Sequence, residues 1–243
     1  MVKAVALRGR PPAGRGRRVL IGWVVAAAVV GGCSSGSIAS DALAGQSGKQ
    51  ILDKAVGNLK AAPSFTMSGD VIQPSGTFSV DLGYQPARGC TGTVSQAGKG
   101  SFTMTVIGAT AWVRPDDAFW RSIDGRQAAS VISAVGGKFL KGPISDKNVA
   151  GLTSLCDVSV LASQLQAPST VERAPVKPFA GTLAVPLTDL AKGGTLYVTD
   201  TARPQVIQLR NSRSGKMTFH IDAPVTLAPP PASKTVNGSQ FGL

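Results

Sequence analysis

The stretch Thr77-Phe78-Ser79-Val80-Asp81-Leu82-Gly83-Tyr84 alternates polar and apolar side chains until the glycine before its last residue. A period of two is typical of a β-strand that has one face on a core and the other in water. The same alternation recurs in one upstream segment, 65–71, and in one downstream segment, 102–106. These three segments predict antiparallel strands of one sheet with a single wet face.

Further strand patterns lie near the end of the chain, at 183–187, 196–198, 206–209 and 217–221. In the middle, Ala111-Trp112-Val113 and Ala118-Phe119-Trp120 flank the turn-forming sequence Arg114-Pro115-Asp116-Asp117, which predicts one more hairpin.

Helical spacing of apolar residues occurs in three segments. The first covers 51–59 and must end before Pro63, the second covers 128–135 and ends at Gly136-Gly137, and the third begins near Asp146 and reaches Val160. A helix, several strands, two helices and more strands predict one α+β domain. A few helical turns can cover only part of the apolar face of such a sheet.

The start of the chain has the pattern of an export signal. The first 18 residues carry six basic side chains and no acid, and the run from Val19 to Val30 is almost wholly apolar but too short for a convincing membrane span. It ends at Val30-Gly31-Gly32-Cys33, which resembles the lipobox of bacterial lipoproteins. This resemblance implies that residues 1–32 are a removed signal peptide. It also implies that Cys33 carries the diacyl anchor on the extracytoplasmic face of the cell membrane. The alternative is a buried N-terminal helix that happens to end in cysteine.

The charge of the chain does not indicate a nucleic-acid surface. Six of the 25 basic residues lie in the leader, so half of the formal charge of +12 is lost with it. The remaining basic residues form no dense run and aromatic residues are few, which argues against nucleic acid as a partner. Solvated surface charge is the preferred explanation of the modest excess, and attraction to anionic lipid head groups is the alternative.

Composition divides the rest of the chain into three parts. Residues 33–48 are rich in Ser, Gly and Ala and are expected to form a lipid-anchored flexible tether. Residues 49–225 contain the helix and strand patterns of the folded domain. Residues 226–243 contain Pro229-Pro230-Pro231 and a Ser/Asn/Gly-rich end, so a disordered Pro-rich tail is expected.

Cys90 and Cys156 are the two cysteines of the expected domain. In an exported protein two such thiols most economically form a disulfide. Two cysteines with no histidine nearby in sequence lack the ligands of a zinc site.

Several stretches together resemble actinobacterial lipoproteins of the LppX/LprG type, which are related in fold to the LolA lipoprotein carrier. The likeness lies in the lipobox and tether, in the helix that runs into 64–69, in Gly108 to Arg114 with Phe119-Trp120, and in Gly194 to Thr199. It implies a curved, antiparallel half-barrel with helices on its concave face and an apolar cavity that holds acyl chains. The cysteine pair and Arg203-Pro204 depart from the family pattern.

The resemblance and the strand periodicity predict an envelope lipoprotein that binds or carries amphiphilic ligands. The alternative is a structural lipoprotein with a filled core that binds another, unidentified envelope protein. The expected cavity residues are Phe65, Met67, Phe78, Val80, Phe102, Met104, Leu183, Val185, Leu196, Val198, Met217 and Phe219.

Enzyme chemistry has little support in the sequence. The single histidine, His220, falls on the polar side of a strand, and Asp116-Asp117 after a proline is typical of a solvated turn. We therefore expect no enzyme, no cofactor and no metal, and a hydrolase lacks a catalytic constellation. Trp112 and Trp120 are expected in the core, with cavity lining as the alternative.

Overall fold

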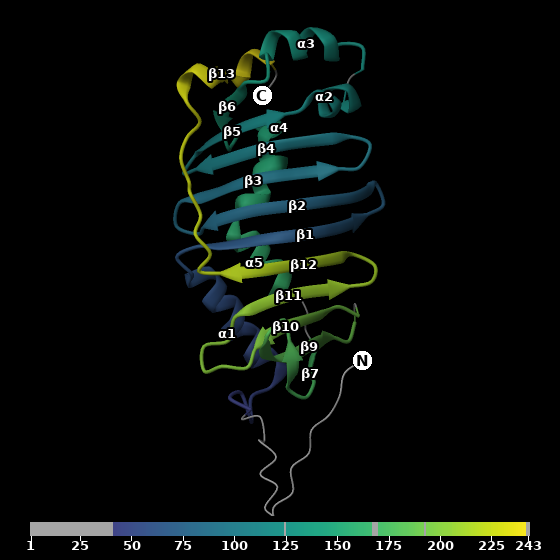
Figure 1. Ribbon diagram of the computed structural model, residues 1–243, viewed down its shortest axis with the longest axis vertical. Coiled ribbons are helices and arrows are strands. Elements are labelled where there is room, and N and C mark those ends of the chain that lie inside the picture. Colours follow the sequence, from purple (N-terminus) through teal and green to yellow (C-terminus); the bar gives the residue numbers. More distant parts are fainter. Residues whose placement is uncertain (1–40, 124, 167–169, 192, 242–243) are drawn as a thin grey trace, which may run out of the picture. The chain divides into compact units, whose positions relative to one another are not determined.

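A computed structural model describes residues 41–123, 125–166, 170–191 and 193–241 (Figure 1). The expected signal peptide, the anchor residue Cys33 and the first part of the tether lie outside the described residues. No helix of the described part combines the length and the apolarity needed to cross a bilayer.

The described residues form one open, mostly antiparallel sheet with helices, which confirms the α+β fold class. The strands are β1 (Phe65–Gln73), β2 (Gly76–Gln85), β3 (Gly89–Gln96), β4 (Gly100–Ile107), β5 (Thr110–Pro115), β6 (Phe139–Pro143), β7 (Val171–Arg173), β8 (Lys177–Phe179), β9 (Thr182–Asp189), β10 (Thr195–Thr199), β11 (Val206–Asn211), β12 (Gly215–Ile221) and β13 (Thr235–Asn237). Their order is β13-β6-β5-β4-β3-β2-β1-β12-β11-β10-β9-β7, with β8 also paired to β9. Only β13 and β6 run parallel among these pairs.

Strand β2 shows how the sequence assigns the two faces. Val80, Leu82 and Tyr84 are buried, whereas Ser79 and Asp81 are exposed. Because paired positions of neighbouring strands share a face, the buried apolar residues of β1, β3, β4, β11 and β12 lie on the same side. We call this side the inner face and the opposite side the outer face.

Helix α1 (Gly48–Ala61) forms where the sequence predicts it. Ser47 and Gln50 make a reciprocal capping box at its start, and the helix ends before Pro63. Its buried residues belong to the main core. The chain is already packed upstream of α1: Leu43 is buried and its N–H donates to the Asp200 carboxylate at 3.2 Å, so contacts with the domain begin inside the segment expected as tether.

The helical segment expected as one helix is divided in two. Helix α4 (Lys147–Thr153) leads into the 3-10 turn η1 (Ser154–Cys156), and α5 (Val158–Gln166) follows. The break occurs because Asp157 adopts an extended backbone and its carboxylate accepts the N–H groups of Ser159 and Val160, which open α5. Figure 1 shows α4 and α5 behind the sheet, on one face of it.

The prediction that 118–120 forms the second strand of a hairpin is wrong, because these residues belong to helix α2 (Asp117–Ile123). The Asp116 carboxylate accepts the Phe119 N–H at 2.7 Å and the Ser101 N–H at 2.9 Å, which starts a helix and ties it to β4. Helix α3 (Ala128–Val135) ends as expected, at Gly136 in the left-handed conformation with φ of 58°.

The C-terminal segment is attached to the sheet over much of its described length. The carbonyls of Ala223 and Val225 accept hydrogen bonds of 2.7 Å from the Ser64 hydroxyl and the Gln85 amide, and Leu227 is buried. The chain then reaches β13 on β6 along the ends of the intervening strands, as the yellow trace of Figure 1 shows. Proline-rich composition therefore marks an extended strap here, since prolines fit extended backbone that needs few N–H donors.

Candidate ligand cavity

A cavity of about 560 Å³ lies between the inner face of the sheet and the helices α4 and α5. Its sheet side consists mainly of apolar side chains from β1, β2, β3, β4, β11 and β12, and its other side comes from α4, η1 and α5. The residues around it are Met67, Val71, Gln73, Phe78, Val80, Tyr84, Val94, Phe102, Gly151, Leu152, Ser154, Leu155, Asp157, Val160, Leu161, Gln164, Leu165, Leu209, Ser214, Met217 and Phe219.

Half of the residues expected in the cavity do line it. They are Met67, Phe78, Val80, Phe102, Met217 and Phe219.

The other expected residues lie elsewhere on the inner face. Leu196 lines a smaller neighbouring cavity, and Leu183 is half-buried at the start of β9. Phe65, Met104, Val185 and Val198 are fully buried in packed core. Val185 and Val198 share that core with the buried face of α1, which Figure 1 shows behind the β9 to β12 end of the sheet. Helix α1 therefore fills the inner face where the sequence predicted open space.

Two smaller cavities adjoin the main one. A cavity of about 210 Å³ shares Leu165 and Leu209 with it, and one of about 240 Å³ shares Phe78 and Phe102. The shared side chains place one smaller cavity beside the β11 part of the main cavity and the other beside its β2 and β4 part.

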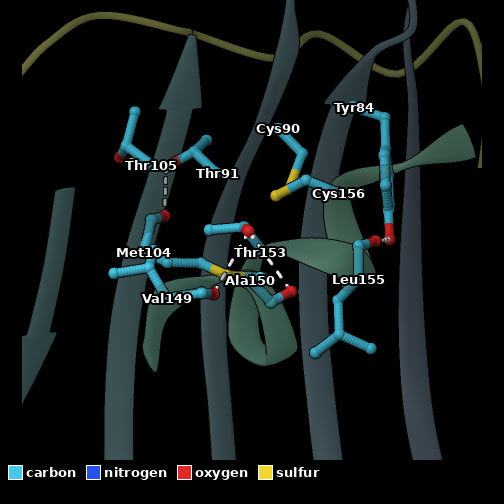
Figure 2. The surroundings of a disulfide bond; sticks show 10 residues. All are labelled: Tyr84, Cys90, Thr91, Met104, Thr105, Val149, Ala150, Thr153, Leu155 and Cys156. Carbon is cyan, nitrogen blue, oxygen red and sulfur yellow. Dashed lines mark hydrogen bonds between the residues drawn. A yellow bond between two sulfur atoms is a disulfide. The ribbon is translucent and has the colours of Figure 1, made fainter. Parts of the chain in front are cut away.

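The 3-10 turn η1 is fixed to the sheet at two points (Figure 2). The disulfide expected between Cys90 and Cys156 is present, with a Cα to Cα distance of 5.3 Å, and it joins β3 to η1. On the neighbouring strand, the Tyr84 hydroxyl donates to the Leu155 carbonyl at 2.8 Å. The helices α4 and α5 are therefore held near the middle of the segment that covers the cavity.

Neutral side chains dominate the polar part of the cavity. Burial raises the pKa of the Tyr84 phenol, which stays protonated and donates its hydrogen bond. The acid in the lining, Asp157, already caps α5. No lysine, arginine or histidine is among the described residues that line the main cavity. The surface is thus suited to apolar chains and offers Gln73, Gln164 and Ser214 as neutral hydrogen-bonding groups.

Sequence reasoning missed the helical side of the cavity. Leu152 and Val160 were recognised as members of an apolar helical pattern, but a helix pattern does not tell whether its apolar side meets a filled core or a void. Val94 was missed for another reason, because β3 has glycines at 89 and 92 and shows no clear alternation.

The other candidate residues lie away from the main cavity. His220 is exposed and pairs with Thr66 across β12 and β1. Trp112 is half-buried on the outer face with the Lys141 ammonium 5.9 Å from its ring centroid, and Trp120 lies edge-to-face with Phe119 on α2. In the described part of the chain, no group of three or more His, Cys, Asp or Glu side chains could hold a metal ion.

The fold resembles solved structures at low sequence identity. LprF from Mycobacterium bovis matches with a TM-score of 0.51 and 16% identity, over 75% of this chain and 96% of LprF. The lipoprotein LppX from Mycobacterium tuberculosis matches with a TM-score of 0.48 and 11% identity, over 74% of this chain and 98% of LppX. Neither protein-family models nor curated protein sequences give a match. The likeness to LprF confirms the expected fold and, at this identity, shows the fold alone.

Proposed function

We propose that this chain is a cell-envelope lipoprotein that holds the acyl chains of amphiphilic ligands between its sheet and α5. The observation that carries the proposal is the apolar cavity of about 560 Å³, which has two smaller cavities beside it. Pockets for small ligands generally measure about 300–1,000 Å³. Each buried methylene contributes about 0.8 kcal/mol, so partial insertion of one chain gives useful affinity without any catalytic group.

The void also supports this function over the alternative of a structural lipoprotein with a filled core. A filled core would leave no space between the apolar side chains of β1, β2 and α5. The adaptable side chains Met67 and Met217 line the cavity, which suits ligands of irregular shape.

The test compares tryptophan substitutions on the two faces of the sheet. Val80→Trp places the large ring in the cavity, whereas Thr93→Trp places it on the outer face of the adjacent strand. We expect mass spectrometry of the purified full chain to find co-purified acylated ligands in the wild type and in Thr93→Trp, and a strong loss in Val80→Trp. Equal ligand content in all three proteins, or no bound ligand after incubation with fatty acids, would refute the proposal.

We also propose that Cys33 carries the anchor, because it follows the lipobox-like Val30-Gly31-Gly32. The Cys33→Ala variant lacks the thiol needed for the thioether, so it should leave the membrane fraction, while Cys33→Ser controls for the size of the side chain. Anchoring through this residue is wrong if both variants, with the leader removed normally, fractionate with the membrane as the wild type does. The outcome is independent of the cavity.

A further inference from the structure

A second concave site lies on the outer face of the sheet, opposite the acyl cavity. It is an open depression of about 720 Å³ at the ends of β1, β10, β11 and β12, beside the turn that joins β11 to β12. Its lining includes Asp70, Thr195, Arg210, Ser212 and Lys216. The lining of the depression carries two cations, whereas the described residues that line the main inner cavity include none.

Two of its cations occupy directly opposed positions. Arg210 on β11 pairs in register with Lys216 on β12, and Lys216 pairs with Asp70 on β1. Like charges directly opposite each other across a strand pair destabilise a sheet. Asp70 is the one acid in the lining, and its carboxylate accepts the Ser79 hydroxyl at 2.7 Å. Among the described residues, no ion pair within 4.0 Å involves Arg210 or Lys216. The positive charge of the site is therefore incompletely compensated.

The guanidinium of Arg210 is held in place by aromatic rings. Its Cζ lies 5.1 Å from the ring centroid of Phe179 and 5.7 Å from that of Tyr197, and the two rings stack at 3.8 Å. The Arg210 Nε donates to the side-chain oxygen of Gln208. The two terminal amino groups of the guanidinium make no hydrogen bond to another described residue. A fixed guanidinium with both terminal groups available is suited to bidentate recognition of an oxyanion.

Further groups around the depression match the same ligand. The Lys177 ammonium lies 5.3 Å from the Tyr197 ring centroid, so it contacts the same ring as Arg210 but does not line the depression. The hydroxyls of Thr195 and Ser212 can donate to oxygens that the cations leave unpaired. The depression is open to solvent, so the molecule to which such a group is attached can extend out of it.

We propose that this outer depression binds a phosphoryl group, with Arg210 and Lys216 as its principal ligands. The group can belong to a soluble phosphate ester or to a phospholipid head group, which present the same oxyanion. The proposal does not depend on the inner cavity, since no side chain of the acyl site takes part.

The test uses the chain without the proposed leader, residues 33–243, with Cys33→Ala, so that neither the proposed anchor nor the basic, apolar leader binds vesicles itself. One arm titrates sn-glycerol 3-phosphate by calorimetry at low ionic strength. The other measures co-sedimentation with phosphatidylcholine vesicles with and without phosphatidylglycerol. The site variant is Arg210→Gln with Lys216→Gln, and the control is Lys60→Gln with Lys147→Gln, which removes the same charge from exposed helical positions.

We expect the site variant to weaken binding about tenfold or more, because charge-assisted hydrogen bonds are lost. The control should change binding less than about twofold, since exposed charges contribute little individually. Arg210→Lys keeps the charge but loses the paired N–H donors of the guanidinium, so its affinity should lie between those of the site variant and the control. Binding of sn-glycerol 3-phosphate would show that a phosphoryl group is sufficient. Binding to the phosphatidylglycerol vesicles without binding of sn-glycerol 3-phosphate would identify a lipid head group as the ligand. Equal losses in the site variant and the control, or no binding in either arm, would overturn the proposal.

Discussion

At the scale of the residue, Tyr84 links the sheet to the cover of the cavity through one hydroxyl group. Its ring stacks on Phe65 at 4.5 Å and its hydroxyl donates to the Leu155 carbonyl. Tyr84→Phe keeps the ring and should lower the free energy of unfolding by about 1 kcal/mol in urea denaturation. An unchanged unfolding midpoint would show that the hydrogen bond adds nothing to stability.

The same residue predicts a dependence on alkaline pH. Burial raises the pKa of Tyr84 in the folded state, so the folded protein holds this proton more tightly than the unfolded chain does. Its contribution to stability is complete below the ordinary tyrosine pKa of about 10 and is lost as the pH rises above it. The stability difference between wild type and Tyr84→Phe should therefore shrink above about pH 10, and a constant difference up to pH 11.5 would contradict the assignment.

Asp116 is a second residue whose carboxylate determines local structure. Burial raises its pKa, but hydrogen bonds from the Phe119 and Ser101 N–H groups and the Ser101 hydroxyl outweigh that effect and lower the pKa overall. Asp116→Ala should cost about 1 kcal/mol of stability at neutral pH. Asp117→Ala is the neighbouring control, because it removes only an exposed ion pair with Arg121, worth about 0.5 kcal/mol or less.

A lowered pKa in the folded state also fixes the direction of the pH effect of Asp116. Its contribution is present above the ordinary aspartate pKa of about 3.9 and is lost as the pH falls through the lower, folded value. Asp116→Asn retains the cap acceptor and should lack this acid dependence. If the acid unfolding curves of the wild type and the asparagine variant coincide, the charge of Asp116 has no role.

At the scale of the element, the disulfide holds η1 against β3. It closes a segment with a sequence separation of 66, for which the loss of chain entropy in the unfolded state predicts about 4 kcal/mol of stabilisation. The double variant Cys90→Ser/Cys156→Ser should unfold at correspondingly lower urea concentration and exchange bound ligand faster. Reduction of the wild type under native conditions is the control. It should lower the urea midpoint of unfolding by the same amount, because it breaks the same bond without introducing serine.

Sequence patterns predicted elements well where one periodicity dominates. Strand β2 alternates along almost its whole length, and α1 has both an apolar stripe and a proline stop. The patterns failed where a single contact decides: the Asp116 cap makes 117–123 helical although Phe119-Trp120 favours a strand. Strand β3 was missed because Cys90 and Val94 are its only buried residues, so its neighbours β2 and β4 impose its conformation.

The cavity illustrates the limit of such reasoning at the next scale up. Alternation assigned Val80 and Val185 correctly to one face of the sheet, yet only Val80 borders the void. Which part of a face is filled depends on where α1 and α5 rest, and this is set by contacts between segments far apart in the sequence.

At the scale of the whole molecule, the C-terminal strap connects the centre of the sheet to its β6 edge. Leu227 is buried within it, so Leu227→Ala should lower the free energy of unfolding by about 2 kcal/mol. The adjacent exposed residue supplies the control, Thr226→Ala, which should stay within about 0.5 kcal/mol of the wild type. Equal unfolding midpoints of the two variants in urea would mean that the strap does not stabilise the domain.

The pairing of β1 with β12 has a consequence for the order in which the molecule can be made. Phe65 lies opposite Ile221, so the central seam of the sheet joins the beginning of the domain to its end. A chain released from the ribosome cannot complete this seam until nearly all of it has been synthesised, and pairings of such long sequence separation form slowly. For the exported protein proposed here, the successive hairpins of β1 to β5 can form early, but the two parts of the sheet can be joined only after β12 has left the membrane.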